Sequence, residues 1–192
     1  MYSNIITMDI WGKFCGSVLK ALGWTIDSGA APEDKCILLG APHTSVWDFV
    51  ISYLYYRSTG EKAKCMVKKE FFFPPVSWLV RAMGGIPVDR TNPTTLVRGV
   101  IHEMNSSRHF HLAIAPEGTR KPVKNWKTGF HLIAREANIP VYAGYFDWGT
   151  KHIGRGEKVE LTDDARADMK RIQAIYEEMH LTGKHPEKYI TH

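Results

Sequence analysis

Cysteine is scarce in this chain, and its few occurrences form no pattern typical of disulfides or metal sites. Cys15, Cys36 and Cys65 stand far apart without a CxxC pair, and each lies in an apolar stretch. Three such residues are too few for a disulfide framework. We therefore expect buried thiols in a protein of a reducing compartment.

Long apolar runs and the common metal and nucleic-acid motifs are lacking as well. No uninterrupted apolar stretch approaches the ~20 residues of a spanning helix, and no signal-peptide pattern opens the sequence. The nine histidines show no HExxH or similar spacing, which disfavours a metal-dependent hydrolase and predicts that no metal is bound. Without a helix-turn-helix, RNA-binding or zinc-finger signature, we expect no nucleic-acid partner.

What is present is the composition of an ordinary globular domain. Of 192 residues, 44% are hydrophobic and 23% charged, which suits one domain with a sizeable core. The formal net charge of +5 favours anionic partners such as lipid headgroups or phosphate compounds. No internal repeat, low-complexity tract or linker divides the chain.

Short apolar runs alternate with amphipathic segments along the sequence. We expect strands at 36–40, 63–67, 86–88, 111–115, 139–146 and 157–161, and helices at 4–24, 46–56, 75–83, 93–104, 128–138 and 164–179. This alternation predicts a single-domain layered α/β fold with a mainly parallel central sheet flanked by helices. We divide the chain into an N-terminal amphipathic helix (1–28), the main domain (29–182) and a loose tail (183–192).

Two apolar features have more than one interpretation. The first helix is apolar over most of its surface, so it either packs on the domain or lies in a membrane interface, which Trp11 and Trp24 would suit. The three adjacent phenylalanines at 71–73 point in different directions, and they belong either to the core or to the wall of an apolar groove.

The turn after the first predicted strand carries His43, and Asp48 follows in the first turn of the next helix. Ligands of open α/β sheets gather beyond the carboxyl ends of the strands, so a base at His43 would face substrate while Asp48 holds its ring. A structural interpretation also exists, because Ser45 and Asp48 have the spacing of a capping box.

Charged clusters follow three predicted strands: His43, Arg90 and the segment 117–120. In a parallel sheet these strand ends lie at one rim. The sequence therefore predicts that the three clusters converge.

Three blocks stand in a fixed order: HTSVWD at 43–48, GIPVDR at 85–90 and PEGTR at 116–120, with a weaker fourth, IPVY, at 139–142. In this order and spacing they resemble the glycerolipid acyltransferase (PlsC-like) family over roughly residues 35–150. The resemblance implies a glycerol-3-phosphate acyltransferase-like fold and an O-acyltransferase. It would move a fatty acyl group from acyl-CoA or acyl carrier protein to a lysophospholipid hydroxyl, for example of 1-acylglycerol-3-phosphate.

The chemistry agrees with these residue types. A hydroxyl is a poor nucleophile near neutral pH, so a base must take its proton, and imidazole titrates in that range. His43 is thus the expected general base, and Asp48 is expected to orient it and stabilise its charged form. Beyond the thioester co-substrate, no cofactor is expected.

The remaining predicted site residues belong to the acyl acceptor. Arg90 and Arg120 would hold its phosphate, a task that suits bidentate guanidinium groups. By the resemblance, Glu117, Gly118 and Thr119 shape the acceptor site. Lys68 and Lys127 are either auxiliary cations or ordinary surface lysines. The resemblance also implies a membrane surface as partner, with the protein cytoplasmic and peripheral to the inner face of the cell membrane.

Departures from the family pattern leave the acceptor open. Pro42, Ala115 and Lys121 replace residues common beside the blocks, and the fourth block continues to Asp147 and Trp148. Another lyso-lipid, including an aminolipid, or a non-catalytic lipid-binding role remains an alternative. We further expect an apolar groove from His43 toward residues 71–73, with the first helix beside its opening.

Overall fold

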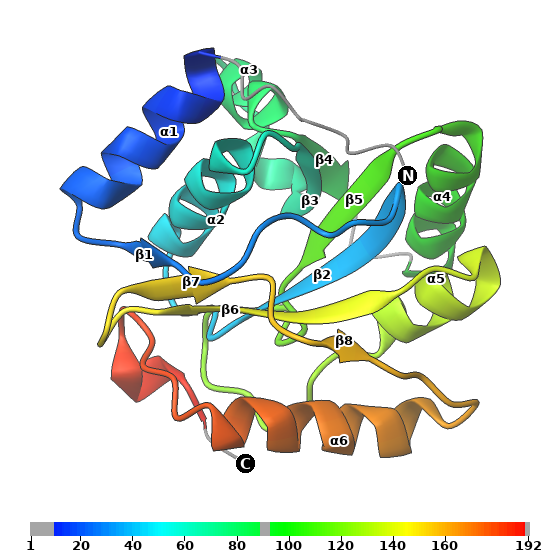
Figure 1. Ribbon diagram of the computed structural model, residues 1–192. Helices are drawn as coiled ribbons and strands as arrows, with labels where there is room; N and C mark the ends of the chain where they lie inside the picture. The colour runs from blue at the N-terminus through cyan, green and yellow to red at the C-terminus, as the bar shows by residue number, and fades with distance from the viewer. Residues whose placement is uncertain (1–9, 89–92, 191–192) are drawn as a thin grey trace, which may run out of the picture.

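The computed structural model describes residues 10–88 and 93–190, which build an eight-stranded sheet with helices on both faces (Figure 1). The strands are β1 (Thr25–Ile26), β2 (Lys35–Ala41), β3 (Ala63–Lys68), β4 (Gly85–Val88), β5 (Phe110–Ile114), β6 (Val141–Asp147), β7 (His152–Gly154) and β8 (Lys158–Val159). The helices are α1 (Ile10–Ala21), α2 (Trp47–Ser58), α3 (Val76–Ala82), α4 (Pro93–Ser106), α5 (Gly129–Ala137) and α6 (Ala165–Glu178), with 3-10 turns η1 (Lys69–Phe71) and η2 (Pro186–Lys188).

The sheet is mainly parallel, as the alternation of elements predicts. Its order is β1-β7-β6-β2-β5-β3-β4, with β8 paired to β6 outside this path. The central strand β2 is parallel to both neighbours, β5 and β6. Among the strands that the structure describes, the antiparallel pairs are those of β6 with β7 and with β8. The predicted fold class is therefore confirmed.

Alternate residues of β2 enter two separate cores, because successive side chains of a strand point to opposite faces. Ile37 and Leu39 join the larger core, beneath α4, α5 and α6. Cys36 and Leu38 join the smaller core, beneath α1 and α2. A strand buried on both faces has to be apolar throughout. This explains why the run before His43 shows no alternation.

Helix α1 packs on α2 through a narrow face and leaves apolar residues in solvent. Cys15 and Leu19 are fully buried, whereas Ile10 is 89% exposed and Trp11 and Phe14 are about half exposed. Trp11 donates its indole hydrogen to Tyr53 of α2 (3.0 Å). The helix therefore combines packing on the domain with an exposed apolar face. Within residues 10–88 and 93–190, no helix has the length and apolar character to cross a bilayer.

Strands β1 and β7 are absent from the expectations, because segments of two and three residues carry no measurable periodicity. They form because Asp147 organises the tight turn between β6 and β7, accepting hydrogen bonds from Gly149 and Thr150. β1 then pairs with β7. Residues 25–26 therefore belong to the sheet, so a boundary at residue 28 separates no independent unit.

The expectation of a loose tail is wrong for residues 183–190. The backbone N–H of Thr182 donates to Asp147, and the N–H of Trp148 donates to the carbonyl of Thr182. Gly183 is buried, and Tyr189 packs against the larger core. The sequence did not predict this packing, because most residues of the tail are polar and Tyr189 is its one aromatic residue. We call residues 182–189 the C-terminal segment.

Ile172 supplies the central contact of α6 with the larger core, where it is fully buried. Ile172→Ala should lower the free energy of unfolding by about 2–5 kcal/mol, since truncation leaves a cavity. The exposed neighbour Lys170 is the matched control, and Lys170→Ala should change stability by less than about 0.5 kcal/mol. Denaturant unfolding checks both values, and equal effects would contradict the assigned packing.

Candidate active site

Three strands end together at one rim of the sheet and carry the central site residues there. β2 is in parallel register with both β5 and β6. His43 follows β2, Glu117 follows β5, and Trp148 directly follows β6. Parallel strands direct their carboxyl ends to the same edge, where open α/β sheets bind ligands. Two of the three clusters predicted to converge, His43 and residues 117–120, therefore lie at the same rim of the sheet.

Asp48 lies in the first turn of α2 with a side chain only 1% exposed. Its Oδ2 accepts the backbone N–H groups of Thr44 and Ser45, each at 2.7 Å. Its Oδ1 accepts the indole N–H of Trp148 at 2.8 Å. A buried carboxylate needs such donors, because burial without them is costly. The hydrogen bond from the Ser45 N–H is the half of the predicted capping box that forms, although the N-cap of α2 is Val46 and has no side-chain cap.

His43 completes the dyad, with Nδ1 3.2 Å from Oδ2 of Asp48. When Nδ1–H faces the carboxylate, the lone pair lies on Nε2, at the opposite side of the ring. The imidazole is 24% exposed, so it is open to a second molecule on one side. A buried acid that holds a partly exposed imidazole is the arrangement of a general base.

Glu117 supports the main chain of His43. Its side-chain Oε2 accepts the His43 backbone N–H at 2.7 Å, and the residue is only 4% exposed. Burial raises the pKa of Glu117 to about 8; the hydrogen bond from His43 lowers it, and the nearby charge of Asp48 raises it. At neutral pH the carboxyl is therefore mostly protonated, and it still accepts through its carbonyl oxygen.

Gly118 occupies the left-handed region, with φ of +67°, where a side chain is strained. A Cβ atom on Gly118 would stand 3.0 Å from Cγ of Lys127. The two residues are thus in contact, which brings exposed Lys127 to the turn after β5. Thr119 bonds within this turn, where its hydroxyl accepts the N–H of Lys121 (3.2 Å).

The predicted phosphate-binding cations differ in burial and in their partners. Arg120 is half-buried, with its guanidinium 5.7 Å from the ring centre of Phe71. Lys68 ends β3 at the same rim but is exposed and paired with Glu70 at 3.2 Å. Arg90 lies outside the described residues. Phe71 is thus linked to the site by a cation–π contact rather than buried in the core.

Trp148 and the C-terminal segment are the parts of the site that sequence reasoning missed. Trp148 stands one residue beyond the end of β6, and the sequence signal was limited to its place after a predicted strand. Lys184 covers its ring, with Nζ 4.2 Å from the ring centre. His185 donates its backbone N–H to the hydroxyl of Thr44 (3.2 Å).

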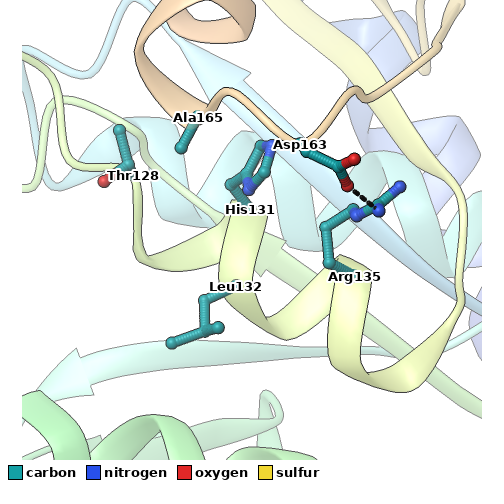
Figure 2. Close-up of a pocket in the computed structure, with 6 residues that line it drawn as sticks. All are labelled: Thr128, His131, Leu132, Arg135, Asp163 and Ala165. Atoms are coloured by element: carbon teal, nitrogen blue, oxygen red, sulfur yellow. Dashed lines mark hydrogen bonds and ion pairs between the residues drawn. The ribbon is translucent and has the colours of Figure 1, made fainter.

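Two hollows formed by the described residues do not include the dyad. One, of about 290 Å³, is lined by residues of α5 and the start of α6, including His131, Arg135 and Asp163 (Figure 2). Arg135 and Asp163 pair with each other across it. A second lies along α6. Neither includes residues 43–48 or 71–73, so the expected apolar groove is not found in these two hollows.

One cluster at the opposite end of β5 has the composition of a metal site, formed by Glu61, His109 and His111. Both ring nitrogens of His111 are already used: the hydroxyl of Tyr56 donates to Nδ1 (2.6 Å), and Nε2 bonds the carbonyl of Glu33 (2.7 Å). Burial lowers the pKa of His111, which favours this neutral form. Hydrogen bonding therefore accounts for the cluster.

Comparison with solved structures identifies the same fold in the 1-acyl-sn-glycerophosphate (LPA) acyltransferase PlsC of Thermotoga maritima. The TM-score is 0.60 and the identity 18%, with 91% of this chain and 80% of that chain covered. This likeness concerns the fold.

Sequence comparison gives the family. A 1-acyl-sn-glycerol-3-phosphate acyltransferase of Streptococcus pneumoniae (strain ATCC BAA-255 / R6) is 31% identical over 111 residues, which are 57% of this chain and 40% of that protein. The match thus spans two fifths of that relative's length. The profile of the Acyltransferase family matches residues 27–146, which include His43, Asp48, Arg90 and the 117–120 block. The resemblance to PlsC-like glycerolipid acyltransferases is confirmed, and the chain belongs to the acyltransferase family.

Proposed function

We propose that this protein transfers a fatty acyl group from a thioester, acyl-CoA or acyl carrier protein, to a hydroxyl of a lysophospholipid such as 1-acylglycerol-3-phosphate. The observation that carries the proposal is the His43–Asp48 dyad, with its acid buried and its imidazole open at the sheet rim. The family and the relatives support acyl transfer.

The dyad is suited to direct attack by the acceptor. His43 Nε2 takes the hydroxyl proton while the oxygen forms a bond to the thioester carbonyl carbon. Asp48 stabilises the resulting imidazolium through Nδ1, as the acid of a Ser-His-Asp triad does. The tetrahedral intermediate then collapses, the carbon–sulfur bond breaks, and the thiolate takes the proton from Nε2. No covalent enzyme intermediate is needed.

The acceptor phosphate needs cations near this base. Arg120 and Lys127 belong to the turn after β5, and Lys68 ends the neighbouring strand β3. We assign the phosphate to Arg120 and Arg90, with Lys68 and Lys127 as auxiliary charges, because guanidinium groups bind phosphate in a bidentate manner. Gly118 and Thr119 shape the turn. Glu117 accepts the backbone N–H of His43, so we assign it to the support of the base and not to contact with the acceptor.

Exposed apolar side chains support a membrane surface as partner. Trp78 is 76% exposed, and Phe73 and Leu79 are more than half exposed. Helix α1 adds Ile10, Trp11 and Phe14. Exposed patches of this kind mark membrane or partner contacts. We assign the protein to the cytoplasmic face of the membrane as a peripheral enzyme, with a positive charge suited to anionic headgroups.

Removal of the general base provides the direct test. With a phosphate-bearing lyso-lipid acceptor, His43→Ala should reduce acceptor-dependent thiol release from acyl-CoA or acyl carrier protein by about 10²–10⁴-fold, the usual contribution of a general base. His102→Ala, in an exposed stretch of α4, is the matched control and should retain activity.

Other outcomes of this assay point elsewhere. Thiol release without any acceptor would indicate a thioesterase. Release with an aminolipid but not with a phosphate acceptor would reassign the substrate. If folded wild-type protein binds lipid and releases no thiol with either donor, the protein is a lipid-binding module and the catalytic proposal is wrong.

The phosphate assignment predicts a selective change in KM. Arg120→Gln should raise the KM for a phosphate-bearing acceptor about tenfold or more, because one charge-assisted interaction is lost. For an acceptor without phosphate the KM should change little. Lys124→Gln removes an equal charge from an exposed position of the same loop and is the control. An equal loss for both acceptors would refute a phosphate contact.

Glu117 predicts a pH-dependent stability term. Its pKa is raised to about 8 in the folded protein, so the unfolded chain releases the proton first as the pH rises. The stability present below the unfolded pKa is lost progressively up to about pH 8. Glu117→Gln keeps an acceptor for the His43 N–H but does not ionise. Between pH 5 and 8 the free energy of unfolding of this variant should fall less than that of wild type. The difference between the two decreases should be on the order of a few kcal/mol. Identical pH profiles would show that the carboxyl is ionised when folded.

A further inference from the structure

We propose that Trp148 is a positioning residue of the dyad, and that residues 182–185 of the C-terminal segment hold it in place. This proposal rests on the proposed function, since it concerns the base of that reaction. Trp148 acts through Asp48, whose Oδ1 accepts its indole N–H at 2.8 Å.

The indole bond fixes a rotation that the backbone donors leave free. Thr44 and Ser45 both donate to Oδ2 of Asp48, and His43 faces the same oxygen. Three groups at one oxygen restrain it, but the carboxylate can still turn about that point. The indole at Oδ1 supplies the second anchor. It thereby sets the plane of the carboxylate that orients the imidazole.

Trp148 is itself held from three sides. Trp24 meets its ring edge-on at 5.1 Å between centroids. Lys184 places its ammonium 4.2 Å from the ring centre, and the same ammonium lies 5.3 Å from the ring of Trp47. Its backbone N–H donates to Thr182. An indole so enclosed has little freedom to leave Asp48.

The C-terminal segment reaches a second donor of Asp48. A Cβ atom on Gly183 would stand 2.7 Å from Cγ2 of Thr44, and His185 donates to the Thr44 hydroxyl. The backbone N–H of Thr44 is one of the two donors to Oδ2. Residues 182–185 therefore stabilise both the Trp148 side and the Thr44 side of the carboxylate.

Trp148→Phe keeps an aromatic ring and removes the N–H. We expect kcat to fall about 10–100-fold, the size of one lost hydrogen bond to a charged group, with the KM of both substrates within about twofold. The Nδ1 proton resonance of His43, which reports the hydrogen bond to Asp48, should shift or broaden in the absence of substrate. Trp126→Phe, which alters a buried indole of the larger core, is the matched control, and its kcat and His43 resonance should match wild type.

A second variant tests the segment without altering the indole. Gly183→Ala drives a methyl group into Thr44 and should lower kcat at unchanged KM, whereas Gly29→Ala, which meets open space, should leave kcat unchanged. A Trp148→Phe protein that unfolds at lower temperature but keeps the wild-type Nδ1 resonance of His43 and the wild-type kcat overturns the proposal. The resonance is read without substrate, so it decides the proposal even if the transferase assay fails.

Discussion

The site depends on keeping one carboxylate charged inside the protein. Asp48 is almost fully buried, and an isolated buried carboxylate would cost more free energy than a small domain can spare. The fold meets this demand with donors from two separate parts of the chain: the turn after β2 and the residue after β6. The order of the central strands follows the same need, because β2 must lie beside β6 for these donors to meet.

The two motif acids have opposite environments at one rim. Asp48 is surrounded by donors, whereas Glu117 has one donor among the described residues and a raised pKa. A charge on Asp48 makes a second charge on Glu117 unfavourable, as for any two acids that share a site. One acid can therefore serve the imidazole as a charged partner while the other serves the main chain as a neutral one.

Much of this arrangement was predictable from the sequence. The strand before His43, the helix that carries Asp48 and the parallel sheet follow from apolar runs and their spacing. β1 and β7 were not predictable, because their two and three residues depend on the turn at Asp147 and on partners already in place. The burial of Glu117, the indole of Trp148 and the contact of Gly183 with Thr44 depend on tertiary register, which no local pattern encodes. The predicted function of Arg90 stays a prediction, because Arg90 lies outside the described residues.

The contact between His185 and Thr44 joins residues separated by 141 positions. All the motif blocks precede the C-terminal segment, so a chain that has emerged only as far as residue 150 carries every motif without the support at Thr44. Contacts of such long range form late in folding, because their loop-closure entropy is large. Chains that fold during synthesis would thus acquire a well-ordered dyad only after the rest of the sheet is complete.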